Sequence, residues 1–488
     1  MVKYEKKKYP FSTSRVKQRE HVLPILPIDT GRYGTPEMLE IFKEENYFQK
    51  LLDVEAALAW AHAQVGNIPK EDAEKIMRMA STKYVKVSRI KEIEREIKHD
   101  IMSLVRAFAE VCGPSGAYIH LGITSYDAVD TAKALQLKEA IELISRKLDE
   151  LELVLLKQAD RYKRTIMIGR THGQHALPIT FGLKLSVWMR EISRHIQRLR
   201  ECKERLIVGK MSGAVGTQAG LGAHALKIQE LVMEKLGIKA AEVSTQIIQR
   251  DRHAELICIL AMIASSLDKF ATEIRELQRT EIGEVFEPFE RKKQVGSSTM
   301  PHKRNPELCE RICGLAKIVR GLVIPALENI PTWHERDLTQ SSSERFIIPE
   351  ACILVDYMLY LMIGIISNLE VDEKRMKRNV DITQGRTMSE AVMMALTKKG
   401  MSRQDAHELL RKLAIRSISE KVPFKEVLMR DESVTSLLSE KEIEEALRPE
   451  NYLGTSVEQV EMAIRRTLEE RQARGLNQKT AKNRYVYK

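Results

Sequence analysis

The chain has 488 residues, of which 30% are charged and only 5% are aromatic, and it contains 24 Gly and 15 Pro. So few turn-forming and aromatic residues argue against a many-stranded β protein and favour long helices, in about three domains by length. The net charge of +11 favours acidic partners, but the two signs are interspersed and no zinc-finger or RNA-binding signature is present. Small anionic metabolites are therefore favoured over nucleic acid.

The N-terminal third begins with an irregular basic arm over residues 1–30, whose opening charges are not followed by the apolar segment of a secretory signal. A helical domain is expected over 31–122. Its first helix should start at Thr35-Pro36, because this pair places an N-cap residue before a proline at the first helical position. Helical sequence covers 37–66, about 70–80 and 101–111.

A central domain of very long helices is expected over 123–370. One seam repeats apolar residues at alternating spacings of four and three, and a second repeats leucine or isoleucine every seven residues. The seams are Leu137, Ile141, Ile144, Leu148, Leu151 and Leu155, then Leu185, Ile192, Leu199 and Leu206; further helices are expected over 306–328 and 344–369. Such seams need partners, so we expect an all-α, three-region fold around a long-helix bundle that oligomerisation completes.

The last helical domain is expected over 371–470, with shorter helices that begin at capping boxes such as Ser439-x-x-Glu442. A basic tail over 471–488 should fray. The most apolar run, 346–366, is interrupted by Pro349, Glu350 and Asp356, which favours a buried helix over a membrane span. The six cysteines include no CxxC pair, which is typical of free thiols in a reducing compartment. We therefore expect a cytoplasmic protein.

The segment from Gly296 to Pro306, GSSTMPHKRNP, joins small residues to a helix start. Lys303 and Arg304 supply positive charge, and Asn305-Pro306 reads as an N-cap followed by proline at the first helical position. The segment can place a serine oxygen beside a cation and free helix N–H groups, which suits a developing anion. Its pattern alone fits a basic surface loop that caps a helix equally well.

Three histidines, His99, His120 and His172, lie beside expected element boundaries, where scaffolds present functional groups. Each alone fits a capping or core histidine, but together with the 296–306 segment they favour a functional site. The glycine-rich run 209–222 has no strand before it and no Gly-Lys-Ser/Thr ending, so it favours a close turn over a phosphate-binding Walker loop.

The 296–306 segment resembles the signature of the fumarase/aspartase superfamily, whose members cleave a C–N or C–O bond beside a carboxylate and release fumarate. The resemblance extends from about Arg32 to Leu468. Within the superfamily the chain is most similar to the purine-pathway branch, through the Arg32-Tyr33 pair, Thr245-Gln246, Gln249–His253 and Trp333–Arg345.

This resemblance implies cleavage of adenylosuccinate to AMP and fumarate, and of the succinyl carboxamide ribotide SAICAR to AICAR. It also implies no metal or organic cofactor, no nucleic-acid or membrane partner, and a homotetramer whose active sites combine residues of three subunits.

Carried over by position, the resemblance implies that Ser297 is the catalytic base, with Ser298 as the alternative. His172 would be the general acid, held and charged by Glu310. The implied substrate contacts are Thr124, Ser125, Lys303 and Asn305 for the succinyl carboxylates, Arg32, Tyr33, Arg336, Ser341 and Arg345 for the 5′-phosphate, and His99, Asp100, His120 and Gln246 for positioning.

Two alternatives remain open. One is a sister enzyme of the same fold, either argininosuccinate lyase or carboxymuconate cycloisomerase, and the latter shares much of the 296–306 signature. The Arg32-Tyr33 pair with Ser341 and Arg345 favours a phosphorylated substrate, which those sisters lack. The other is a basic helical protein that binds nucleic acid without catalysis, which would leave the histidine motifs unexplained. Gln340, where relatives often carry His, departs from the pattern without removing a proposed acid, base or phosphate ligand.

Overall fold

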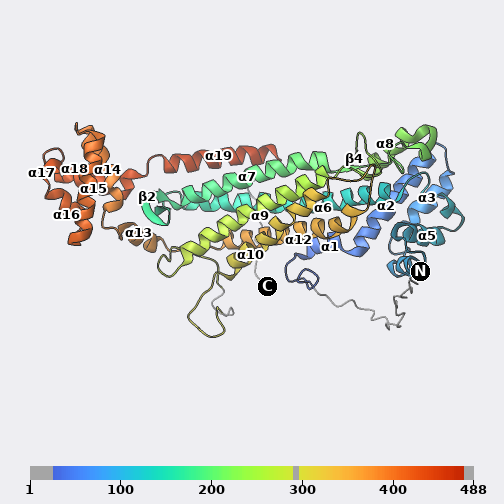
Figure 1. Ribbon diagram of the computed structural model, residues 1–488, viewed down its shortest axis with the longest axis horizontal. Coiled ribbons are helices and arrows are strands. Elements are labelled where there is room, and N and C mark those ends of the chain that lie inside the picture. Colours follow the sequence, from blue (N-terminus) through green and yellow to red (C-terminus); the bar gives the residue numbers. More distant parts are fainter. Residues whose placement is uncertain (1–25, 290–295, 477–488) are drawn as a thin grey trace, which may run out of the picture.

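The computed structural model describes residues 26–289 and 296–476, and these form an elongated, mainly helical molecule (Figure 1). A long central bundle carries one smaller helical unit at each end. The expected all-α fold is confirmed. The expected arm up to residue 25 and the expected tail from residue 477 lie outside the described residues.

The bundle is built from long helices that alternate in direction. Three of them, α6, α9 and α12, run in the same direction, as contacts between their first turns show. Asp130 of α6 pairs with Arg250 at the start of α9, and Lys133 of α6 pairs with Glu344 of α12. α7 and α10 run the other way. The helices are α6 (Ser125–Arg161), α7 (Phe181–Leu206), α9 (Asp251–Gln278), α10 (Glu307–Gly321), its continuation α11 (Val323–Glu328) and α12 (Thr339–Ser367).

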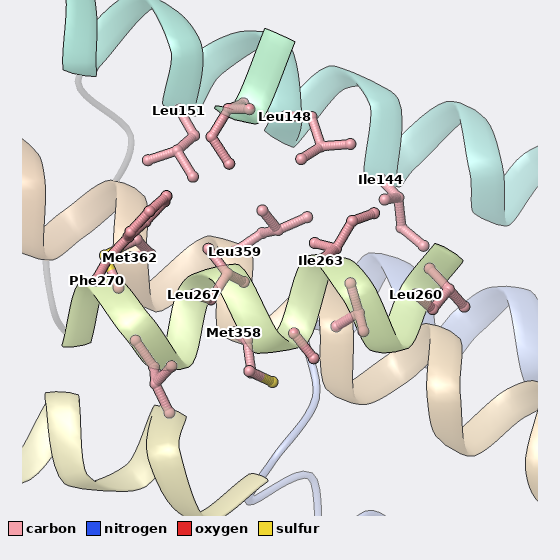
Figure 2. Packing of buried hydrophobic residues seen from close by; sticks show 14 of the residues in the cluster. Ile144, Leu148, Leu151, Leu260, Ile263, Leu267, Phe270, Met358, Leu359 and Met362 are labelled. Carbon is pink, nitrogen blue, oxygen red and sulfur yellow. The ribbon is translucent and has the colours of Figure 1, made fainter. Parts of the chain in front are cut away.

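Apolar side chains fill the space between α6, α9 and α12 (Figure 2). Leu148 of α6, Leu267 of α9 and Leu359 of α12 point toward one another and are fully buried. Both seams expected from the sequence lie in this core, with every member at most 2% exposed. Among the described residues α12 alone is long and apolar enough to span a membrane, and 78% of its most apolar window is buried in the bundle. The expectation of a buried helix at 346–366 is confirmed.

A buried ion pair ties the N-terminal segment to the bundle. Lys147 Nζ lies 2.7 Å from Asp356 Oδ2, and the Thr35 hydroxyl donates to the same carboxylate oxygen at 2.5 Å. Thr35 is also the N-cap of α1 (Pro36–Phe42), where its side chain accepts from the N–H of Met38. The predicted helix start at Thr35-Pro36 is confirmed.

The N-terminal unit packs four further helices around a second core. The sequence pattern did not predict the helix over Val87–Ile97. These helices are α2 (Glu44–Gln64), α3 (Lys70–Met79), α4 (Val87–Ile97) and α5 (Asp100–Cys112), and α8 (Ala225–Leu236) packs against α2.

Within residues 26–289 and 296–476 the strands are short and form three separate two-stranded ladders. β1 (Ile166–Thr171) and β2 (Gln174–Thr180) make an antiparallel hairpin between α6 and α7. The other ladders join segments distant in the sequence: β3 (Val208–Gly209) with β4 (Lys239–Ala240), and β5 (Val285–Phe286) with β6 (Glu370–Val371).

The C-terminal unit is a small bundle with its own core. The capping box at Ser439 and Glu442 is confirmed. The elements are α13 (Glu373–Asp381), α14 (Ser389–Lys398), α15 (Arg403–Glu420), α16 (Phe424–Met429), α17 (Glu432–Thr435), α18 (Glu440–Leu447) and α19 (Ser456–Ala473).

The last helix, α19, leaves this unit and returns along α7 and α6 (Figure 1). Arg471 is only 4% exposed and lies 3.0 Å from the buried Glu152 carboxylate of α6. The first residues of the expected basic tail therefore belong to this helix, which continues to Ala473, whereas residues 477–488 lie outside the described part of the chain.

Gly182, at the start of α7, permits a close approach to the end of α6. A Cβ at this position would lie 2.5 Å from the carbonyl oxygen of Ala159 and from Cα of Lys163. We expect Gly182→Ala to destabilise the fold by about 1–3 kcal/mol through overpacking, seen as a lower thermal unfolding midpoint.

Gly314 of α10 provides the matched control, because a Cβ there would meet no atom within 4 Å. Gly314→Ala should be neutral or stabilising by about 0.5–1 kcal/mol. Equal unfolding midpoints for the two variants would contradict the close approach.

Candidate functional site

The expected site residues lie in separate groups along one chain. α6 has 37 residues and is therefore about 55 Å long at 1.5 Å per residue. Thr124 and Ser125 lie at its start, whereas His172 follows its end by way of β1. One chain thus cannot bring all of the predicted residues into one site.

At the start of α6, a cluster forms around Arg336, which we call the Arg336 cluster. Arg336 Nη1 donates to Gln246 Oε1 at 2.8 Å, and its guanidinium carbon lies 3.5 Å from the ring centroid of Tyr126. The Tyr126 hydroxyl donates to Ser341 Oγ at 2.8 Å. Three predicted residues, Arg336, Gln246 and Ser341, are therefore brought together by Tyr126, an aromatic residue that the sequence reading missed.

Arg345, one turn after Ser341, bonds the N-terminal unit. Its Nη2 donates to Asp100 Oδ2 at 2.9 Å. His99 is the N-cap of α5, and its Nδ1 accepts from the N–H of Met102 at 3.2 Å. Because a backbone N–H can only donate, Nδ1 holds the lone pair and Nε2 carries the proton. The half-exposed His99 ring thus offers an Nε2–H donor, one residue before the Asp100 that Arg345 binds.

Charged side chains form a buried network beneath the first turns of α12. The Glu344 carboxylate contacts Lys133, lies 2.8 Å from Arg250 Nε and 3.1 Å from His253 Nδ1, and is 2% exposed. Arg250 also forms a bidentate pair with Asp130, at 2.9 Å for each bond. Burial would raise the pKa of Glu344, but Lys133 and the other cations hold it far below its usual range. This network fixes the helix turn that carries Ser341 and Arg345.

Asp127 anchors the glycine-rich segment 209–222 to the start of α6. Its carboxylate accepts from the N–H groups of Thr124 at 2.8 Å, Ser212 at 2.8 Å and Gly213 at 3.0 Å, and it pairs with the fully buried Lys210. The segment is therefore a turn with close backbone contacts, as predicted. It also borders the Arg336 cluster, because its Ala214 carbonyl accepts from Gln246 Nε2 at 2.8 Å.

At the opposite end of α6, His172 occupies the tip of the β1–β2 hairpin. His172 and Gly173 have φ values of 53° and 73° between the paired residues Thr171 and Gln174, which is the pattern of a type I′ turn. The His172 side chain is exposed and makes no hydrogen bond or ion pair among the described residues. A rigid turn thus presents this imidazole to the outside of the chain.

The 296–306 segment folds back on itself. Asn305 Nδ2 donates to the carbonyl of Gly296 at 3.0 Å, and a Cβ on Gly296 would lie 2.1 Å from the carbonyl oxygen of Lys303, so only glycine fits. Ser297 Oγ accepts from the N–H groups of Thr299 at 3.3 Å and Met300 at 3.0 Å. Those two donors stabilise negative charge on the Ser297 oxygen.

The start of α10 differs from the expectation. The helix begins at Glu307 with Pro306 at the N-cap position, so Asn305 is not the cap. The carboxylate of Glu287, only 2% exposed, accepts from the N–H groups of Leu308 at 3.1 Å and Cys309 at 3.0 Å. The predicted use of these helix N–H groups for an anion is therefore wrong, because Glu287 already occupies them.

The two cations of this segment have different surroundings. Arg304 pairs with Glu370 at 2.8 Å and stacks on Phe289 with 4.8 Å to the ring centroid. Lys303 is exposed and has no partner among the described residues. Lys303 is thus the segment's available positive charge.

Two predicted groupings of site residues do not form within one chain: Glu310 with His172, and Arg32-Tyr33 with the Arg336 cluster. Glu310 is exposed in the first turns of α10, and no hydrogen bond among the described residues joins it to His172. Arg32 and Tyr33 lie along the bundle, where the Tyr33 ring packs 6.1 Å from that of Tyr357, and are not part of the Arg336 cluster. The proposed pairing of Glu310 with His172 therefore stays a prediction.

The supporting residues that the sequence reading missed include Tyr126, Glu287 and Glu55. Tyr126 directly follows the predicted Thr124-Ser125 pair, so its position was a usable signal. Glu287 and Glu55 lie 21 and 65 residues from the groups that they bind. No local pattern reveals such distant pairings.

Comparison with protein families gives two matches. A family model described as "Lyase" matches residues 31–321, and one described as "Adenylosuccinate lyase C-terminus" matches residues 385–463. The first spans more than half of the chain.

Individual proteins resemble the chain over nearly their whole length. It is 53% identical to adenylosuccinate lyase of Pyrococcus horikoshii over 93% of this chain and 100% of that protein, and 48% identical to that of Methanocaldococcus jannaschii over 91% and 96%. Among solved structures, the 3-carboxy-cis,cis-muconate lactonizing enzyme of Pseudomonas putida superimposes with a TM-score of 0.84 at 35% identity, over 91% of this chain and 99% of the other.

Proposed function

The chain belongs to the adenylosuccinate lyase family of the fumarase/aspartase superfamily, and on that premise we propose that it splits adenylosuccinate into AMP and fumarate. The observation that carries the proposal is the 53% identity to the Pyrococcus horikoshii enzyme, which extends over all of that protein. We further propose that the chain cleaves SAICAR to AICAR, because both substrates carry a succinyl group and a 5′-phosphate. The proposed setting is purine nucleotide biosynthesis in the cytoplasm.

The Arg336 cluster and Arg345 supply the chemistry for a phosphorylated substrate. Arginine forks and hydroxyls are suited to phosphate oxygens, and Ser341 and Arg345 are four residues apart on one face of α12. We assign the 5′-phosphate to Arg336, Ser341 and Arg345, together with Arg32 and Tyr33.

The reaction begins with loss of a proton from the carbon beside a succinyl carboxylate. This C–H is a very weak acid, so its removal needs an activated base and donors on the resulting dianion. We assign Ser297 as the base, because the N–H groups of Thr299 and Met300 stabilise its alkoxide. Lys303 and Asn305, with Thr124 and Ser125, are assigned to the succinyl carboxylates.

Departure of the purine nitrogen then requires a proton donor. We assign His172 to this role, because its turn holds the imidazole outside the chain, free to enter another subunit's site. Glu310 is assigned to hold and charge His172. Its exposure on α10 fits a partner that comes from a second copy.

The active form is proposed to be a homotetramer with shared sites. The His172 turn and the Arg336 cluster lie at opposite ends of a helix about 55 Å long, so a complete site needs more than one chain. Exposed apolar side chains of α9 and α11, such as Met262, Ile324 and Leu327, offer a face for other copies.

The decisive assay supplies adenylosuccinate, argininosuccinate and carboxymuconate to the purified protein in parallel. We expect AMP and fumarate in equal amounts from adenylosuccinate, and no turnover of the other two. Fumarate from argininosuccinate alone, or lactone from carboxymuconate alone, would assign the chain to a sister activity. Salt-sensitive binding to arbitrary DNA, without any turnover, would favour the nucleic-acid alternative.

A further inference from the structure

Glu55, in the middle of α2, is a buried carboxylate that binds one residue twice. Its Oε2 accepts from the N–H of His120 at 3.0 Å, and its Oε1 lies 2.6 Å from His120 Nδ1. Glu55 is only 1% exposed. A buried carboxylate is costly unless its charge is compensated, so this pairing calls for a positive imidazole.

The His120 backbone is held in an unusual conformation. Its φ of 63° is left-handed, which costs a residue with a Cβ about 1 kcal/mol or more. Two side chains of α2 hold this turn: Glu55 binds the His120 N–H, and His62 Nε2 donates to the carbonyl of Leu121 at 3.0 Å. Glu55 and His62 are seven residues apart, on the same face of α2. The turn is thus fixed from both sides of His120.

The charges around His120 favour its protonated form. Burial alone would lower the pKa of His120, but the hydrogen bond and charge of Glu55, with a smaller contribution from Asp127 of α6, raise it above its ordinary value. Lys210 already pairs with Asp127, and His62, which also faces this turn, has a pKa lowered by burial. Glu55 therefore dominates the charge state of His120.

The second ring nitrogen of His120 is free. Nδ1–H donates to Glu55, whereas Nε2 has no hydrogen-bond partner among the described residues, and 12% of the side chain is exposed. Thr124 and Ser125, which we assign to the succinyl carboxylates, follow four and five residues later. Asp127, whose carboxylate binds the Thr124 N–H, is close enough to act on the charge of His120. The free Nε2–H therefore belongs to the end of the molecule that is assigned to the succinyl carboxylates.

We propose that Glu55 is a positioning residue that keeps His120 protonated, so that His120 binds an anionic group of the substrate as a fixed cation through Nε2–H. His120 does not exchange protons with the reacting atoms in this arrangement. The inference rests on the proposed lyase function and adds a source for one of the positive charges that a succinylated nucleotide needs.

Glu55→Gln tests the charge with little change of shape. The amide oxygen can accept the His120 N–H, and the amide nitrogen can donate to Nδ1, which leaves a neutral ring that still carries Nε2–H. We expect kcat/KM for adenylosuccinate at pH 7 to fall about ten- to hundredfold, mainly through KM, because a charge-assisted bond becomes a neutral one. The control is Asp53→Asn, which removes a carboxylate two residues earlier on α2 and should leave kcat/KM unchanged.

The pH profile and an NMR titration separate this role from simple support of the fold. The cation is the binding form, so kcat/KM should decline as pH rises through the His120 pKa, and Glu55→Gln should move that decline to lower pH. In the NMR titration of the wild-type imidazoles, His120 should titrate above 6.5, and in Glu55→Gln below 6.5. An unshifted decline, or a wild-type His120 that titrates below 6.5, would overturn the proposal.

A double-mutant cycle with His120→Gln completes the test. If Glu55 acts through His120, Glu55→Gln should cause no further loss of kcat/KM in the His120→Gln background. Full additivity of the two losses would overturn the proposal. If the wild-type protein did not cleave adenylosuccinate, the proposed function would fail, yet the titration of wild-type His120 would still decide whether Glu55 keeps it charged. That titration also decides the matter if Glu55→Gln fails to fold.

Discussion

Ser297→Ala should lower kcat on adenylosuccinate about 10³-fold, with KM changed by less than about threefold. The substitution removes the oxygen that accepts the N–H groups of Thr299 and Met300. The fold of the loop should not change where its two ends meet, because Asn305 still bonds the Gly296 carbonyl and the Lys303 carbonyl still lies close to Gly296. Substrate should thus bind while proton removal stops. Steady-state kinetics of fumarate release, with binding measured by calorimetry, provides the measurement.

Ser298→Ala is the matched control, since Ser298 is the exposed neighbour with no hydrogen bond among the described residues. It should retain most of the wild-type kcat. The reverse outcome, an active Ser297→Ala and an inactive Ser298→Ala, would transfer the role of base to Ser298. If both variants turned over normally, the base would lie outside this loop.

Mixing two inactive variants, His172→Ala and Arg336→Ala, should restore activity. His172 and Arg336 lie at opposite ends of the bundle in one chain, so a complete site must take them from different chains. Each variant alone lacks one of them at every site. In randomly assorted tetramers from an equal mixture, about one quarter of the sites would receive both residues intact.

The experiment uses co-expressed chains with two different affinity tags, purified through both. Because purification through both tags removes tetramers of a single variant, regained fumarate release should be slightly more than one quarter of the wild-type activity, about two sevenths. Tetramers should be verified by native mass spectrometry. The control mixes two preparations of the same variant, which cannot complement. An equally inactive hybrid tetramer would mean that each site draws His172 and Arg336 from one chain.

The bundle could be predicted because its information is local and periodic. The seam from Leu137 to Leu155 repeats at helical spacing, and every member is buried as that repeat requires. α9 was not predicted, although its start, Gln249–His253, was noted for its resemblance. Its signal was present in the sequence all the same, because seven buried residues alternate spacings of four and three: Leu256, Leu260, Ile263, Leu267, Phe270, Ile274 and Leu277. Its partners are the helices on either side of it, which a one-dimensional pattern does not identify.

The site was predictable where motifs are contiguous and unpredictable where pairing is distant. The Thr124-Ser125 pair and the His172 turn could be identified by position. By contrast, the side chain that binds the first N–H groups of α10 is not the expected Asn305 but Glu287, 21 residues before Leu308. Likewise, Glu55 binds His120 although the two are 65 residues apart in the sequence. Their partners are set by how helices pack, so their roles follow only from the folded chain.

The path of α19 shows how the C-terminal unit is connected to the bundle. The chain leaves the bundle after Ser367, forms the small unit, and rejoins the bundle at Ser456, so α14–α18 are an insertion within the bundle's covalent framework rather than an appended module. The buried Glu152 of α6 is paired with Arg471 and Arg474, at the end of α19. A chain shortened before Arg471 would leave the buried Glu152 without these two cations, so loss of the end of α19 alone should lower the stability of the whole bundle.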